Sequence, residues 1–270
     1  MFIKETFQFI AKNKRLILIA LIPAVIMGIF SSPSKIVPFL FAYTPGRLSS
    51  LGVSIWRLSP VGNPIWLLLI IPAAFLFCAA TLGLAEHKMR VGNYGFHGFW
   101  QRMNFGITAL IAPFAVMIAI YAAWLFLSAC VLTFIEYICF AVIGSAALSI
   151  TMVVIFSLAL CFLLILMFSL LLLWAPVILV SGYGIADSWY YQTRLLSGKV
   201  LKFALAMAVP FAASSVLVTC FGLFLSAHFM IYVNILCYTF IIIYLIGLAM
   251  TAYFKLSDTP RKDIKKKYYM

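Results

Sequence analysis

The fold of this chain is decided by residues 107–181, ITALIAPFAVMIAIYAAWLFLSACVLTFIEYICFAVIGSAALSITMVVIFSLALCFLLILMFSLLLLWAPVILVS. This stretch contains one formally charged side chain, Glu136. A water-soluble domain must cover its surface with polar side chains, and the stretch has too few of them. Lipid is the solvent in which such a surface is stable, and segments that cross lipid satisfy their backbone polar groups internally. The sequence therefore predicts an all-α, polytopic membrane helix bundle.

The charged residues outside this stretch indicate how the chain is threaded. Of 270 residues 66% are apolar and 9% are charged, and 19 Lys and Arg against six acidic residues give a formal net charge of +13. Sixteen of these cations fall in four patches, at residues 4–15, 88–102, 194–202 and 255–267. Basic loops remain in the cytoplasm, so we assign all four patches, and both termini, to that side. The basic excess therefore reflects membrane topology, and we expect no nucleic-acid partner.

Six transmembrane spans follow from this assignment. Both flanks of residues 107–181 are basic, so an even number of spans must fit between them, and the turn signal at Gly144-Ser145 favours two. The predicted spans are residues 16–30, 65–85, 106–142, 146–181, 200–226 and 229–254. Residues 1–15 are predicted to form an amphipathic helix on the cytoplasmic interface, with Ile3, Phe7 and Ile10 on one face. The predicted membrane domain is thus 16–254, with cytoplasmic loops at 86–105 and 182–199, and a basic tail follows at 255–270.

The third and fourth spans are longer than a membrane is thick. Each is roughly 50 Å long or more, against a hydrocarbon core of about 30 Å. We therefore expect the hairpin to project outward, or to break near residues 128–136. Residues 31–63 carry four prolines and an apolar islet, IVPFLFAY, and are predicted to form an external loop resting at the interface.

The two cytoplasmic loops share a pattern of aromatic and basic residues. The first contains Tyr94-Gly95, then Trp100 and Arg102; the second contains Tyr183-Gly184, then Trp189 and Arg194, with Asp187 and Lys199 nearby. Tryptophan and arginine suit the headgroup layer, so both loops are interpreted as interfacial helices that contact anionic lipids or dock a protein partner. The shared spacing also suggests a duplicated helix–loop–helix unit. Ordinary enrichment of these residues at membrane interfaces is the alternative explanation.

Two stretches carry a family resemblance over roughly residues 75–215. They are FLFCAATLGLAEHKMRVGNYGFHGFWQRMNFGITALI and WAPVILVSGYGIADSWYYQTRLLSGKVLKFALAMAVPF. Together they resemble uncharacterised six-helix bacterial membrane families, which include the membrane domain fused to some glycerophosphodiester phosphodiesterases. The residues that carry the resemblance are Pro176, Asp187, Arg194, Leu195, Gly198 and Lys199. It implies a helical bundle of a bacterial plasma membrane and no particular activity, because the phosphodiesterase catalytic domain has no counterpart here.

Candidate reactive residues are few. The chain has no HExxH, G-x-S-x-G or P-loop motif, and the spacing of Glu86, His87 and His97 matches no standard zinc site. Intramembrane polar residues are functional candidates by default, which singles out Glu136 and Asn234. We therefore expect a non-enzymatic protein without a cofactor.

Three functional classes remain open on the sequence. The first is a small permease-like or accessory membrane subunit, and the second is a membrane scaffold or regulatory protein with no transported substrate. A lipid-modifying membrane enzyme is the third.

Overall fold

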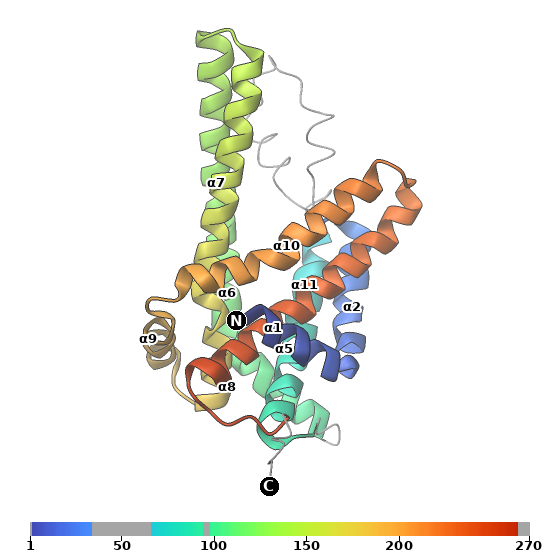
Figure 1. The fold of residues 1–270 in the computed structure, drawn as a ribbon, viewed down its shortest axis with the longest axis vertical. Helices are drawn as coiled ribbons and strands as arrows, with labels where there is room; N and C mark the ends of the chain where they lie inside the picture. Colours follow the sequence, from blue (N-terminus) through green and yellow to red (C-terminus); the bar gives the residue numbers. More distant parts are fainter. Residues whose placement is uncertain (1, 34–65, 94–97, 264–270) are drawn as a thin grey trace.

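The computed structural model describes residues 2–33, 66–93 and 98–263, and the regular elements in these ranges are helices (Figure 1). In chain order they are α1 (Phe2–Lys12), α2 (Lys14–Phe30), α5 (Leu67–Val91), α6 (Phe99–Glu136), the π-helix η3 (Tyr137–Val142), α7 (Ala146–Leu172), α8 (Trp174–Ser181), α9 (Ile185–Leu196), α10 (Val200–Gly222) and α11 (Ala227–Leu256). The predicted all-α fold class is confirmed.

Five helical segments are long and apolar enough to cross a membrane, so the chain is a multi-pass membrane protein. They are 67–91, 99–139, 147–181, 200–222 and 228–256. A sixth is counted only when α1 and α2 are taken together, and these two helices are bent by 95°. By itself α2 has 17 residues, which gives a length of about 26 Å. The predicted number of six spans therefore agrees with the structure when the bent α1–α2 pair is counted as one span.

The long hairpin formed by α6 and α7 rises beyond the other helices (Figure 1). Its turn lies at the predicted place: Gly144 has a φ of +72°, and the Ser145 side chain accepts the Leu148 N–H at 3.3 Å. The predicted break at residues 128–136 is misplaced, because α6 is regular through Glu136 and the irregular segment is η3. In η3 the hydrogen bonds span five residues instead of four, and the Ile143 N–H donates to the Ile138 carbonyl at 3.1 Å. The irregular segment thus lies directly before the hairpin turn.

Proline 176 explains why the other arm is divided into α7 and α8. Proline has no N–H to donate to the carbonyl four residues earlier, here Leu172, and its ring crowds that carbonyl. Accordingly α7 ends at Leu172, and the regular pattern resumes where the Val177 N–H donates to Leu173 at 3.1 Å. The other four helical prolines, at positions 23, 72, 113 and 210, lie inside continuous helices.

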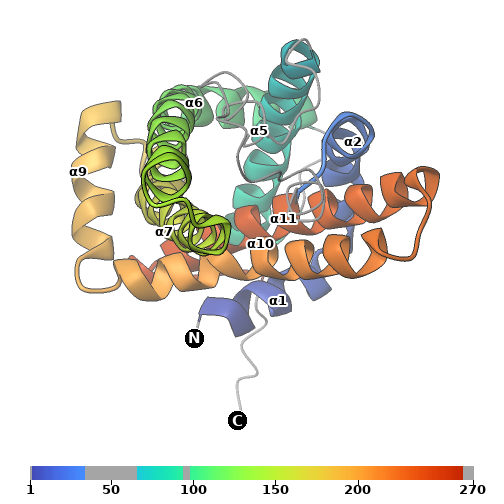
Figure 2. The same ribbon diagram turned by 90° about the horizontal axis from the view of Figure 1, so that it is seen from above.

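Helix α11 is the centre of the bundle and packs against α1, α2, α5, α8 and α10. In Figure 2 the α6–α7 hairpin is seen nearly end-on, while α10 and α11 run across the view. Tyr244, Leu248 and Ala252 of α11 are fully buried. The Tyr244 hydroxyl donates to the Ala206 carbonyl of α10 at 3.0 Å, so the one polar atom of this side chain is satisfied inside the core.

Glycines allow the closest helix crossings. A Cβ placed on Gly83 would collide with the Arg102 carbonyl oxygen, and one on Gly106 would collide with that of Ala79, so α5 and α6 meet backbone to backbone. A Cβ on Gly28 of α2 would come within 2.8 Å of the Ile235 nitrogen on α11. Small residues of this kind let helices approach closely in membranes, where packing replaces the hydrophobic effect as the driving force.

Two expectations about the ends of the chain and the loops need correction. The predicted loop at 86–105 is largely helical, because α5 continues to Val91 and α6 begins at Phe99. The amphipathic helix predicted within 1–15 is present as α1, yet its most buried face is Phe2, Thr6 and Phe9, not the face of Ile3 and Phe7, which are 38% and 44% exposed. Helix α1 therefore has one face against the bundle and an apolar edge left for lipid. The predicted islet in the 31–63 loop lies outside the described residues.

Substituting Gly106 tests the α5–α6 crossing. We expect Gly106→Ala to lower the free energy of unfolding by about 1–3 kcal/mol, because the new methyl group must push two backbones apart. The measurement is the thermal unfolding midpoint of the protein in lipid nanodiscs. Gly222→Ala is the matched control, since its Cβ would meet only the Met230 Cε, at 3.9 Å. An equal loss of stability in both variants would contradict the crossing.

Candidate functional site

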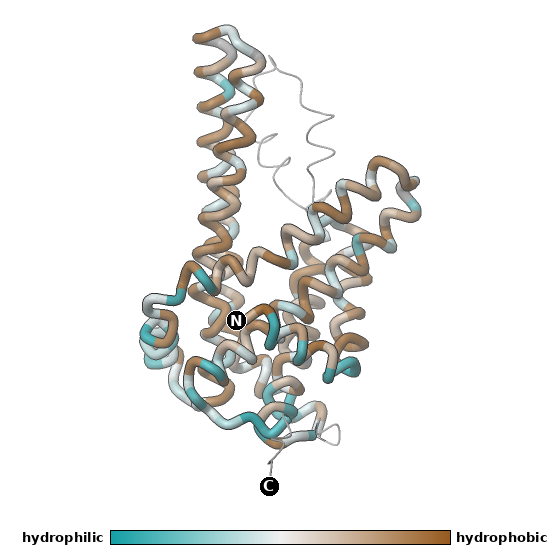
Figure 3. The backbone as a smooth tube through the Cα atoms, viewed as in Figure 1, coloured by the Kyte–Doolittle hydropathy of each residue, from teal (hydrophilic) through white to brown (hydrophobic). Residues whose placement is uncertain are grey.

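Contacts between distant segments bring the described parts of the four basic patches to one end of the bundle. The Lys255 ammonium of α11 pairs with the Glu5 carboxylate of α1, and the Phe2 ring meets Phe203 of α10 edge-on at 5.7 Å. The Lys262 backbone N–H donates to the Met89 carbonyl at the end of α5 at 2.9 Å. We call this region the basic end; Figure 3 shows hydrophilic residues concentrated there and an apolar α6–α7 hairpin. The predicted grouping of the patches on one side is thus reproduced, and its cytoplasmic location stays a prediction.

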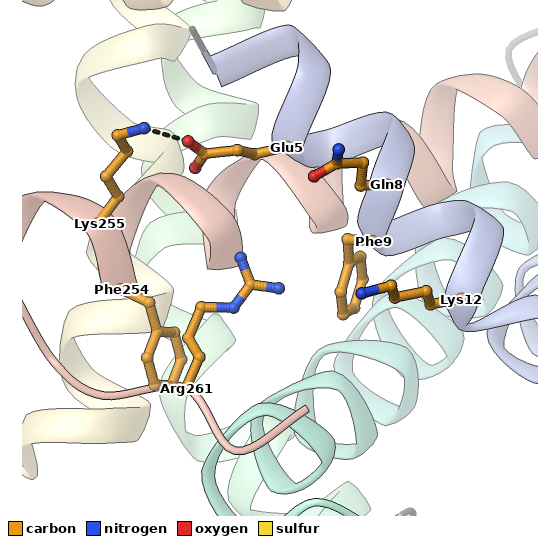
Figure 4. A pocket seen from close by; sticks show the side chains of 7 residues that line it. All are labelled: Glu5, Gln8, Phe9, Lys12, Phe254, Lys255 and Arg261. Atoms are coloured by element: carbon orange, nitrogen blue, oxygen red, sulfur yellow. Dashed lines mark hydrogen bonds and ion pairs between the residues drawn. The ribbon is translucent and has the colours of Figure 1, made fainter. Parts of the chain in front are cut away.

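A cavity of about 350 Å³ opens at the basic end (Figure 4). Its lining residues come from α1, the end of α11 and the segment that follows: Glu5, Gln8, Phe9, Lys12, Phe254, Lys255 and Arg261. Phe9 and Phe254 are almost fully buried and form an apolar floor. In Figure 4 the Arg261 guanidinium and the Lys12 ammonium point into the open space from opposite sides. The cavity therefore combines an apolar base with converging cationic groups.

Sequence reasoning did not find this cavity. Lys12 and Arg261 are far apart in the chain, and each belongs to a patch that topology alone explains. The one available signal is the conjunction of an amphipathic first helix with a basic segment directly after the last span. That conjunction predicts proximity at the membrane surface, but not a shared cavity.

The second predicted loop forms the separate amphipathic helix α9. Gly184 is its N-cap, Asp187 lies in its first turn and Arg194 in its last, which suits the helix dipole. Trp189 packs edge-on against Trp174 of α8, with ring centroids 5.1 Å apart, and the Trp174 indole donates to the Ile185 carbonyl at 3.0 Å. This helix is therefore held by aromatic contacts.

A tyrosine cluster lies beside α9. Tyr183 and Tyr191 meet edge-on at 5.5 Å, and the hydroxyls of Tyr253 and Ser181 lie 2.7 Å apart. Burial raises the pKa of the Tyr191 hydroxyl, with Tyr253 and Tyr183 acting in the same direction and Arg194 opposing them. The hydroxyl accordingly stays neutral and able to donate a hydrogen bond at physiological pH. Lys199 follows α9 and is exposed.

The first loop does not match the second. Trp100 and Arg102 lie in the first turns of the long helix α6 instead of on a short interfacial helix, and Tyr94 and Gly95 lie outside the described residues. Trp100 is 75% exposed, whereas Trp189 is 39% exposed and packed on another tryptophan. The hypothesis that the two tryptophans hold equivalent places on two interfacial helices is therefore wrong. The reason is that the close α5–α6 crossing extends both helices through the region predicted as a loop.

The remaining polar candidates lie at separate places in the bundle. Glu86 is buried and its carboxylate lies 2.6 Å from the guanidinium of Arg90, one turn later in α5. Asn234 of α11 accepts a hydrogen bond from Ser32 at 3.4 Å, which joins α11 to the chain beyond α2. Glu136 is half-buried at the end of α6, next to η3. Across residues 2–33, 66–93 and 98–263, no three His, Cys, Asp or Glu side chains are grouped so that they could hold a metal ion.

Comparison with known proteins adds no assignment. No family profile, no curated protein and no solved structure matches this chain. The resemblance to six-helix bacterial membrane families stays a prediction from the two loop stretches.

Replacing each tryptophan in turn separates their roles. We expect Trp189→Ala to raise the amide hydrogen exchange of residues 185–196 by roughly 10-fold or more, because α9 loses its aromatic contact with α8. Trp100→Ala, which removes a largely exposed ring, should leave exchange in α6 unchanged. The measurement is hydrogen exchange by mass spectrometry in nanodiscs. Equal effects of the two substitutions on their own helices would contradict this distinction.

Proposed function

We propose that this chain is an accessory subunit of a membrane assembly, which binds a larger integral membrane protein through the α6–α7 hairpin. The observation that supports this most is how little of the hairpin is covered by its own chain. In the most apolar part of residues 147–181, only 11% of the residues are buried within the protein, and in that of residues 99–139 the share is 22%. In the other three apolar segments the share of buried residues is 39–44%. The hairpin is thus the large apolar surface that the bundle itself leaves open.

The length of the hairpin supports a protein partner in addition to lipid. α6 has 38 residues and is about 57 Å long, which exceeds a hydrocarbon core of about 30 Å even when a helix is strongly tilted. Apolar side chains continue to its tip, where Val142 and Ile143 are 68% and 56% exposed. Lipid tails cover only the part inside the hydrocarbon, and an apolar patch beyond it marks a protein interface.

A permease-like role is the rival proposal, and the prolines in the spans favour it, because a proline removes one backbone hydrogen bond and makes a helix easier to bend. Against it, the core around α11 is built mainly from apolar side chains, including Ile242, Tyr244 and Met250. Asn234 is engaged by Ser32, which suits helix packing better than a substrate path. The accessory role therefore accounts for more of the described structure.

Site-specific photo-crosslinking in native membranes tests the accessory role. A photoreactive residue at Phe126 of α6 or Leu158 of α7, which are 58% and 67% exposed, should give one discrete protein adduct heavier than the 30.2 kDa chain. Leu236 of α11 is the matched control, because it is 68% exposed but lies outside the hairpin. The control should give adducts with lipid alone.

The outcomes are distinguishable by the mass of the adduct. One adduct with a different membrane protein, formed from both hairpin positions and not from the control, supports the proposal. An adduct of two copies of this chain, the same adducts at all three positions, or no protein adduct at the hairpin would contradict it.

A further inference from the structure

The cavity at the basic end is built by the way in which α1 is seated on α11. The Thr6 and Thr251 hydroxyls lie 3.3 Å apart, and Phe9 lies over Gly247, where a Cβ would come within 3.2 Å of its ring. The Glu5–Lys255 ion pair closes one side. The Lys262 backbone contact with Met89 holds the segment after α11 in place, so that Arg261 reaches the cavity.

The cationic groups in the cavity are available to an additional anion. The Glu5 carboxylate is engaged by Lys255, and no ion-pair partner of Lys12 is found in the described parts of the chain. The Arg261 Nε and Nη2 donate to Asp263 at 3.1 and 2.8 Å. A guanidinium has five N–H donors, so this one keeps donors for a second acceptor. Gln8 adds a side-chain amide to the lining of the cavity, from the same helix as Lys12 (Figure 4).

Phosphate is the anion that fits these groups best. Arginine and lysine are the usual phosphate-binding side chains, and charge-assisted hydrogen bonds to phosphate oxygens are among the strongest available to a protein. A volume of about 350 Å³ exceeds what one bare oxyanion fills and falls within the range of small-molecule sites. The ligand therefore carries a phosphate together with an organic part.

The orientation of α1 sets the depth of the cavity. Because α1 is bent by 95° from α2, α1 lies along the membrane surface when α2 crosses the membrane. The exposed apolar edge of α1, Ile3 and Phe7, agrees with this position. A phosphate in the cavity is then at the level of lipid headgroups.

We propose that this cavity binds the phosphate headgroup of an anionic phospholipid, with Lys12, Arg261 and Gln8 donating to its phosphate oxygens. The Glu5–Lys255 pair acts as a positioning element that fixes α1 against α11. The apolar floor of Phe9 and Phe254 supports the carbon part of the headgroup. This site uses none of the hairpin residues, so the proposal of lipid binding does not depend on the proposed accessory role.

Native mass spectrometry of the full chain, in mixed micelles with phosphatidylglycerol and phosphatidylcholine, tests the proposal. We expect Lys12→Gln to weaken retention of the first phosphatidylglycerol by about 5-fold, since a cation near an anionic headgroup contributes on the order of 1 kcal/mol. Lys4→Gln is the matched control, because Lys4 is an exposed residue of the same helix and carries the same charge but does not line the cavity. The control should change retention less than 2-fold.

A second variant tests whether the loss of lipid is an indirect effect of a change in the fold. Arg261→Gln combined with Asp263→Asn removes the ion pair as a unit and leaves no buried unpaired carboxylate, so its loss of phosphatidylglycerol should match that of Lys12→Gln at an unchanged thermal midpoint. Lys12→Arg should retain the lipid.

Competition distinguishes a lipid from a soluble phosphate compound. Glycerol 3-phosphate and inorganic phosphate at millimolar concentration should not displace phosphatidylglycerol if the lipid is the ligand. Displacement by either compound would overturn the lipid assignment in favour of a soluble phosphate ligand. Equal losses for Lys12→Gln and Lys4→Gln would show nonspecific attraction to the basic end and overturn the site itself.

Discussion

The structure depends on one constraint: backbone N–H and C=O groups inside lipid must find partners within the protein. Helices satisfy this locally, and several threonine side chains of the spans do the same. The hydroxyls of Thr81, Thr239 and Thr251 donate to carbonyls four residues earlier at 2.7–2.8 Å. Because these hydroxyls are satisfied inside their own helices, packing between the helices depends largely on shape. The glycine crossings follow from this, because backbones can approach most closely where no Cβ intervenes.

The same constraint separates the molecule into two regions of different chemistry. Charged residues are placed where water and headgroups can solvate them, which gathers four distant segments into the basic end around α1, α9 and the ends of α5 and α11. The α6–α7 hairpin extends away from that end with a nearly uniform apolar surface (Figure 3). α5 and α10 link the two regions, since α5 packs on α6, α10 packs on α7, and both pack on α11. Lipid binding at one end and protein contact along the hairpin are compatible within a single bundle.

Much of the fold could be predicted from residues 107–181 and the basic patches, because hydropathy and charge act over whole segments. The turn at Gly144-Ser145 was predictable for the same reason: a glycine and a helix-capping serine stand out in an apolar run. The extension of α5 and α6 through the predicted loop was not, since it depends on Gly83 and Gly106 meeting carbonyls on the opposite helix. The seating of α1 and the cavity beside it escape sequence reasoning too, because Lys12 and Arg261 come together only through the docking of α1 on α11. The hydropathy and charge of whole segments can be interpreted from one sequence, whereas pairwise contacts between distant helices cannot be predicted from it.

The most direct test of this account is to measure on which side of the membrane the hairpin turn and the basic end each lie. Single cysteines at Val142, near the turn, and at Lys202, at the start of α10, would be introduced after replacing the six native cysteines. They would then be labelled with a membrane-impermeant maleimide in sealed, right-side-out vesicles. The account predicts that Val142→Cys reacts in intact vesicles and that Lys202→Cys reacts only after the vesicles are opened. Reaction of both positions from the same side would contradict a hairpin that crosses the membrane away from the basic end.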